Sequence, residues 1–387
     1  MTSLVFAVLA AFALALTAGG GGWLSPVAAF HLLVAGGILP LIFGAMLHFV
    51  PVLTRTGPPH RFFQALPWLA QGLGLGVALT LQGLGPRWLL HPLSTLVALL
   101  ALLLILWMRG RARACLGTPH PGWRWYGFSL ACLVLALLVV PPLLAVPEAY
   151  WPLRSLHLHL NTLGFVGLAA LGTLPLLLPT ALGRTDPEAS HWLRRYLWSV
   201  AGSVLMLAVG TALAPINRLA LAGALLAAGG LLLLVYPVLR LLAHWQRQFG
   251  FACLWRDGAT ASLLLAVLGF VALQVAGLLH GFQRLAPRPT ILAFGPGFLL
   301  PLVLGALSQL LPVWRHPGPA TPARSTLRQR LAAGGAGRAL LFLAAALAIL
   351  LGHELPGLVL VALGLGHFLL ALGAGLRQSL PGSERAR

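Results

Sequence analysis

Three histidines lie in long apolar stretches of this chain, where an ionisable side chain is rare and needs a partner. They are His31, His157 and His159. A neutral imidazole can bind a transition metal or act as an axial ligand of heme iron. The alternative is structural, with each ring bonded to a nearby carbonyl or hydroxyl and no ligand role. For a lone histidine in a membrane span, such as His91, His353 or His367, we favour the structural interpretation.

His157 and His159 are separated by a single residue. On an α-helix two residues correspond to a rotation of about 200°, so the two rings point to nearly opposite faces. One helix can then present its imidazoles to two different compartments, or one ring can bind iron while the other bonds elsewhere. A heme between this helix and the helix of His31 is one interpretation of these residues, beside the structural one, and the sequence leaves open which ring of the pair faces His31.

The stretches that begin at His31 and His159 share one pattern with a stretch that begins at Leu292. In each, a Gly follows after five residues, a second Gly after eight more and a Pro after seven more. The instances are His31-Gly36-Gly44-Pro51, His159-Gly164-Gly172-Pro179 and Leu292-Gly297-Gly305-Pro312. Their first residues lie 128 and 133 positions apart, close to a third of the chain. We predict one transmembrane domain of three pseudo-repeats with four helices each, over about 1–122, 123–257 and 258–387.

Gly36 and Gly164 follow the histidines by five residues. A planar macrocycle between two helices needs glycine where it presses on the backbone, so both are candidate cofactor contacts. The alternative is close helix packing, which small residues permit in membranes.

The composition places the chain in a membrane. Of 387 residues, 59% are hydrophobic and 8% are charged, with a mean hydropathy of +0.92. A water-soluble domain has about three times this charged fraction, and long runs without alternation exclude a β-barrel. We predict an all-α polytopic protein with helices near 3–17, 26–53, 65–84, 88–108, 123–146, 156–180, 193–214, 217–243, 258–279, 290–313, 333–352 and 355–376.

The net charge of +19 does not indicate a nucleic-acid partner. All 25 basic residues are Arg, and 20 of them lie in the loops after even-numbered helices or in the C-terminal tail. Such clusters meet anionic lipid headgroups and mark the cytoplasmic side. We therefore predict a multi-pass protein of the bacterial cytoplasmic (inner) membrane with both termini in the cytoplasm. His31, His157 and His159 then lie near the extracytoplasmic surface.

The segment His157-Leu-His-Leu-Asn-Thr-Leu-Gly-Phe-Val-Gly, continuing to Gly172 and Pro179, resembles the heme-ligand helix of heme-copper oxidase subunit I, especially the cbb type. The stretch led by His31 ends Val50-Pro-Val-Leu-Thr-Arg-Thr-Gly57 and resembles the NnrS-like membrane heme and copper proteins. This resemblance implies a subunit I-like bundle and a heme b near the outer face, with His31 matching the second-helix ligand. A second heme would need another ligand, for which His280 is the nearby candidate.

The departures from that family limit the implied activity. The family's oxygen-reducing copper site needs two adjacent histidines and a nearby tyrosine. This chain has no His-His pair, and we find no complete copper site. Its six acids are all in loops, at helix ends or in the tail, whereas a proton pump or nitric-oxide reductase needs carboxylates at depth. The six are Glu148, Asp186, Glu188, Asp257, Glu354 and Glu384.

The expected function is therefore that of a membrane heme-b protein that transfers electrons or handles a diatomic gas such as nitric oxide. Its partners would be membrane lipid, heme and a gas or an electron donor, and Arg154 could pair with a heme propionate. The sequence leaves two other functions open. The chain could be a heme-free transporter or copper-handling carrier, or an assembly partner of a respiratory complex. The oligomeric state is not predicted.

Overall fold

The computed structural model describes residues 1–378, and this part of the chain is helical throughout. Arg385, Arg387 and Glu384, which enter the charge counts above, lie outside the described residues. The helical elements, including short 3-10 and π segments (η), are α1 (Thr2–Gly20), α2 (Pro26–Leu33), η1 (Val34–Ile38), α3 (Leu39–Thr54), α4 (Arg61–Leu81), η2 (Arg87–Leu89), α5 (Leu90–Arg113), α6 (Gly122–Leu138), α7 (Val140–Ala145), η3 (Pro147–Ala149), α8 (Tyr150–His159), η4 (Leu160–Gly167), α9 (Leu168–Ala181), α10 (Ala189–Leu213), η5 (Asn217–Leu219), α11 (Ala220–Phe249), α12 (Phe251–Arg256), α13 (Gly258–Gly281), α14 (Pro287–Phe294), η6 (Gly295–Leu299), α15 (Leu300–Arg315), α16 (Pro322–Ala332), α17 (Gly335–Leu350) and α18 (Glu354–Gln378).

Within residues 1–378, twelve helical stretches are long and apolar enough to cross a membrane. This confirms the prediction of an all-helical, multi-pass membrane protein with about twelve spans. Two stretches begin well before their predicted apolar windows, at Pro147 instead of 156 and at Pro322 instead of 333. Their first turns contain charged residues, which a hydropathy window leaves out although a Pro at the start favours the helix.

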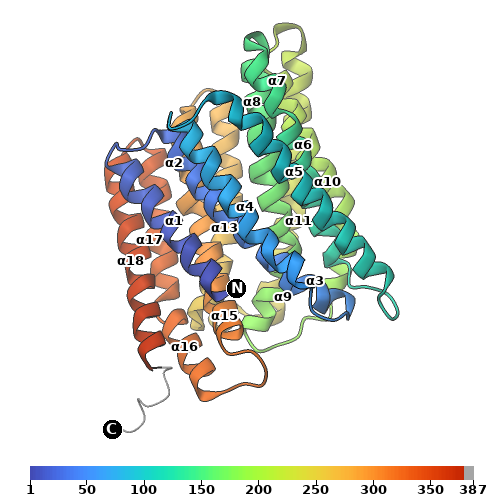
Figure 1. The fold of residues 1–387 in the computed structure, drawn as a ribbon, viewed down its shortest axis with the longest axis vertical. Coiled ribbons are helices and arrows are strands. Elements are labelled where there is room, and N and C mark those ends of the chain that lie inside the picture. Colours follow the sequence, from blue (N-terminus) through green and yellow to red (C-terminus); the bar gives the residue numbers. More distant parts are fainter. Residues whose placement is uncertain (379–387) are drawn as a thin grey trace. The chain divides into compact units, whose positions relative to one another are not determined.

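The chain divides into two compact units. Unit 1 comprises Ser3–Pro175 and Pro187–Pro237 with Met1, and unit 2 comprises Leu176–Asp186 and the described residues from Val238 onward with Thr2. In unit 1, α5 packs along α6, and in unit 2, α17 packs along α18 (Figure 1). Apolar side chains fill the interior of each unit, including the fully buried rings of Trp125 and Phe165 in unit 1 and Phe270 and Phe342 in unit 2.

Helix ends follow local capping chemistry. Ser25 Oγ accepts from the Ala28 N–H at the start of α2, and Thr321 Oγ1 accepts from the Arg324 N–H at the start of α16. Such caps satisfy backbone donors that the first turn leaves without partners. The α3 helix ends at Arg55, which adopts the left-handed conformation with φ 51°.

Three helices contain a π segment, counting only the residues that the structure describes. These segments, η1, η4 and η6, all lie within the stretches that share the Gly/Pro pattern. In η1 the Leu39 N–H bonds to Val34 O, and in η6 the Leu300 N–H bonds to Gly295 O. These bonds lie at the same positions relative to His31 and Leu292, three and eight residues further along. The helix therefore widens at the same place in both stretches.

Proline explains the widening in these two stretches. Pro40 and Pro301 each follow the first residue of the pattern by nine positions. A proline has no N–H, so the carbonyl four residues earlier loses its helical donor. Those carbonyls belong to Gly36 and Gly297. A wider turn with i→i+5 bonds relieves the conflict between the ring and the preceding turn.

Glycine on a neighbouring helix allows close approach to each of these π segments. A Cβ on Gly74 would lie 2.0 Å from the Ala35 carbonyl oxygen in η1. A Cβ on Gly269 would lie 1.8 Å from the Gly297 carbonyl oxygen in η6. No side chain fits at either place, because both distances are far below van der Waals contact.

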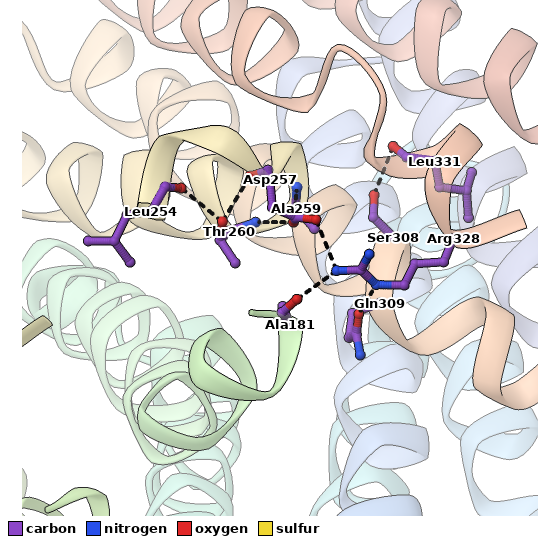
Figure 2. Close-up of polar contacts among 9 residues, drawn as sticks. All are labelled: Ala181, Leu254, Asp257, Ala259, Thr260, Ser308, Gln309, Arg328 and Leu331. Atoms are coloured by element: carbon purple, nitrogen blue, oxygen red, sulfur yellow. Dashed lines mark hydrogen bonds and ion pairs between the residues drawn. The ribbon is translucent and has the colours of Figure 1, made fainter. Parts of the chain in front are cut away.

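An ionic cluster joins several helix ends inside unit 2 (Figure 2). The Arg328 guanidinium on α16 donates to Asp257 Oδ2 at 3.0 Å, to Gln309 Oε1 at 2.7 Å and to the Ala181 carbonyl at 2.6 Å. Asp257 also caps α13, because its Oδ1 accepts from the N–H groups of Ala259 and Thr260. One arginine therefore connects the end of α9, the start of α13 and the side of α15.

We expect Arg328→Met to destabilise unit 2 by about 1–3 kcal/mol, because charge-assisted bonds are lost and Asp257 keeps a partly buried charge. The measurement is the thermal unfolding midpoint in mild detergent. Arg324→Met is the matched control on the same helix, since the Arg324 guanidinium donates to the exposed Gly318 carbonyl. Equal shifts in the two variants would show that the cluster has no special role.

His120 fixes the loop between α5 and α6. Its Nδ1 accepts from the Gly122 N–H at 3.3 Å, and its Nε2 lies 2.7 Å from Ser190 Oγ. With Nδ1 accepting, the neutral ring carries its proton on Nε2 and donates to Ser190. Burial lowers the pKa of His120 below its ordinary value, and the nearby Arg194 cation lowers it further. The neutral ring is therefore the form that the fold stabilises.

This lowered pKa predicts a pH-dependent loss of stability. Above about pH 6.5 the ring is neutral in both folded and unfolded chains, and its full contribution is present. As the pH falls below this value towards the folded pKa, the unfolded chain binds the proton first and the folded state is disfavoured. The stability difference between wild type and His120→Gln should therefore narrow between pH 8 and pH 5 in thermal unfolding. The exposed His60 provides the control variant His60→Gln, and a difference that stays constant with pH would refute the assignment.

Candidate functional site

His31 lies on the last turn of α2, directly before η1. Its Nδ1 is 2.8 Å from the Val27 carbonyl oxygen, one turn earlier in the same helix. Because a carbonyl can only accept, Nδ1 carries the proton and Nε2 is the unprotonated nitrogen. The Phe30 ring lies edge-on to the imidazole. This tautomer is the one that can bind a metal through Nε2.

His157 lies on α8 and is fixed by a different helix. Its Nδ1 donates to the Ala136 carbonyl of α6 at 2.9 Å. Its Nε2 is therefore also unprotonated, and it accepts a long bond of 3.3 Å from the Asn161 side-chain amide. Asn161 donates more closely, at 2.8 Å, to the His157 carbonyl. A backbone carbonyl that orients a ring through Nδ1 is the usual support of a histidine ligand.

His31 and His157 both lie in unit 1. An electrostatic influence of the His31 ring reaches His157. Both residues are partly buried, and both carry an unprotonated Nε2. The candidate site therefore consists of two imidazoles of one unit, from α2 and α8, each oriented by a backbone carbonyl.

His159 faces another neighbour. Its Nδ1 donates to the Ser155 carbonyl at 2.8 Å and lies 3.2 Å from Thr211 Oγ1 on α10. His157 contacts α6, so the two rings of the His-Leu-His segment reach different helices. His159 corresponds to His31 in the sequence pattern and makes the same bond to the carbonyl four residues earlier. The electrostatic influence of His31 therefore involves His157, whereas the shared sequence pattern makes His159 the counterpart of His31.

The other predicted site residues have structural contacts. His280 Nδ1 donates to the Leu285 carbonyl in the turn after α13, within unit 2. The Arg154 guanidinium lies 5.6 Å from the centre of the Trp151 ring on the same helix. A Cβ on Gly36 would meet Leu75, and one on Gly164 would meet Cys132 at 2.6 Å. Both glycines permit close packing here, and their contact with a macrocycle stays a prediction.

Sequence reasoning missed the polar side chains that support the site. Gln71 on α4 donates to the Gly36 carbonyl, and Ser129 on α6 donates to the Phe165 carbonyl. Both side chains are buried. The sequence signal that could have identified them is a polar residue within an otherwise apolar helix. Across the described residues, no cluster of three or more His, Cys, Asp or Glu side chains could hold a metal ion. A cofactor that brings its own ligands needs only one or two side chains from the protein.

The chain matches no protein-family model, and no curated protein matches it significantly. Its function has to be inferred from the geometry of the site.

The two tautomers can be tested in the heme-free protein. Solid-state 15N spectra of protein with labelled histidine should show a protonated Nδ1 and an unprotonated Nε2 for His31 and His157. Spectra of His31→Gln and His157→Gln, each missing one set of signals, provide the assignments. A protonated Nε2 in either residue would remove it from the list of ligands.

Proposed function

We propose that this chain is a membrane protein that binds heme b between α2 and α8, with His31 and His157 as the axial ligands. The observation that carries the proposal is that His31 and His157, two residues of unit 1, each have an Nδ1 bonded to a backbone carbonyl and an unprotonated Nε2. The donor set fits heme, because the macrocycle supplies four ligands and the protein must add only one or two imidazoles. The Asn161 bond to Nε2 is long and would be exchanged for the iron.

The contacts of these residues define what the protein does for the cofactor. Heme b would supply an iron centre that changes oxidation state by one electron or binds a diatomic gas. The Val27 and Ala136 carbonyls fix the orientation of the rings and raise their basicity. Arg154, three residues before His157, has a guanidinium that could turn from Trp151 to a heme propionate. Because both His31 and His157 would hold the group, one-electron transfer is the function that these residues would favour over gas binding.

The threefold repeat and the relation to heme-copper oxidase subunit I and NnrS-like proteins belong to the same proposal. In its support, each of the three patterned stretches contains a π segment: η1 and η6 occupy the same positions of the pattern, and the longer η4 includes these positions. We also propose the bacterial cytoplasmic membrane with both termini inside, on the distribution of arginine. The two proposed ligands also lie at about the same distance along their helical stretches. His31 lies 23 residues before the end of α3, and His157 lies 24 residues before the end of α9.

The test is spectroscopic. Protein expressed with ample heme and purified in mild detergent should give a b-type pyridine hemochrome and a Soret band in the reduced-minus-oxidised spectrum. His31→Ala and His157→Ala should each abolish or shift the low-spin signal, because each removes one axial ligand.

Two variants serve as controls. His159→Ala removes the ring that faces α10, and His353→Ala removes an exposed histidine of unit 2, so both should keep the low-spin spectrum. Absence of a Soret band from the wild type would refute the heme proposal and favour the heme-free carrier. A wild-type spectrum in both ligand variants would show that the ligands are assigned wrongly.

A further inference from the structure

The α6 helix holds the stretch from α8 to η4 at two places. The first is the bond from His157 Nδ1 to the Ala136 carbonyl at 2.9 Å. The second is the bond from Ser129 Oγ to the Phe165 carbonyl at 2.6 Å. Ser129 is completely buried, and Phe165 lies inside η4.

The number of residues between the two bonds is one smaller on α6 than on the stretch from α8 to η4. Ala136 and Ser129 are seven residues apart on α6, which is about two α-helical turns. His157 and Phe165 are eight residues apart. A π segment places one additional residue in the same length of helix. The eight-residue spacing between the two bonds is consistent with the π segment that lies between His157 and Phe165.

Side chains in η4 help to keep this wider geometry. Asn161 donates to the His157 carbonyl and Thr162 Oγ1 donates to the Leu158 carbonyl, both at 2.8 Å. In an α-helix these carbonyls would accept backbone N–H groups from the same two residues, so the side chains compete with the regular ladder. Unlike η1 and η6, this stretch has Leu168 where they have Pro40 and Pro301, so no missing N–H enforces its widening.

We infer that Ser129 is a positioning residue for His157: its hydroxyl keeps η4 in the π geometry that presents the imidazole to His31. Without this donor, the Phe165 carbonyl is buried with a weaker set of partners. The α-helical arrangement then becomes favourable, and it changes the rotation of His157 about the helix axis. Gln71, which donates to the Gly36 carbonyl in η1 at 3.3 Å, makes the corresponding bond beside His31. This inference rests on the proposed function, because the readout that matters is the geometry of the heme ligand.

Ser129→Ala tests the inference with little change in volume. The ferric protein should keep its heme content but show a shift in its largest EPR g value, which reports the relative orientation of two axial imidazoles. Ser129→Thr retains the hydroxyl and should restore the wild-type g value. In the heme-free protein, the 15N resonances of His157 should shift in Ser129→Ala as well.

Ser262→Ala is the matched control. Ser262 on α13 donates to the Pro301 carbonyl at 2.8 Å, two residues after η6, in the stretch that has Leu292 instead of histidine. This variant should lower the unfolding midpoint about as much as Ser129→Ala and leave the EPR spectrum unchanged.

The outcomes separate this inference from the heme proposal. Wild-type g values and wild-type His157 resonances in Ser129→Ala would overturn the positioning role while leaving the heme assignment intact. An equal EPR shift in Ser262→Ala would also overturn it, since the effect would then be a general loss of stability. If wild-type protein binds no heme, the proposed function fails, and the 15N resonances of His157 alone decide whether Ser129 positions the ring.

Discussion

Every backbone donor and acceptor inside an apolar span has to find its partner within the protein, because lipid offers none. The regular helices satisfy this requirement themselves. The three π segments interrupt it, and at two of them a buried side chain on a neighbouring helix bonds to a carbonyl inside the segment. Gln71 does so for η1 and Ser129 for η4. Gln71 and Ser129 are therefore buried where the helical ladder is broken, whereas other buried polar side chains of unit 1, such as Thr54 and Thr80, bond to carbonyls of their own helices.

The same requirement determines how the histidines are held. Ala136 belongs to the last turn of α6, whose carbonyls lack donors within the helix. The Nδ1–H of His157 supplies one of them. A purely structural role would end with that bond. A second imidazole of the same unit, His31, has its own Nδ1 fixed by a carbonyl in the same way, so both rings keep an unprotonated Nε2.

The sequence predicted the class of fold and the number of spans, because hydropathy over about 20 residues reports directly on burial in lipid. It did not predict the π segments. The glycines of the pattern were visible, but Gly36 and Gly164 were interpreted through their small size, whereas the signal for widening in η1 was Pro40. The choice between His157 and His159 was also beyond the sequence. Both rings point away from the helix axis, and only the positions of α6 and α10 determine which neighbour each one meets.

The third patterned stretch separates what belongs to the fold from what belongs to the site. It keeps the proline at the ninth position and the π bond from Leu300 to Gly295, yet it begins with Leu292. Around η6 the rings of Phe270, Phe294 and Phe298 pack on one another, with centroid distances of 4.9 and 5.5 Å. Widening therefore persists where no histidine precedes it, so a π segment alone is not evidence for a cofactor. What distinguishes the other two stretches is an imidazole before the widening. The π segments accordingly belong to the framework that the three stretches share, and the histidines belong to the two stretches in which we place the candidate site.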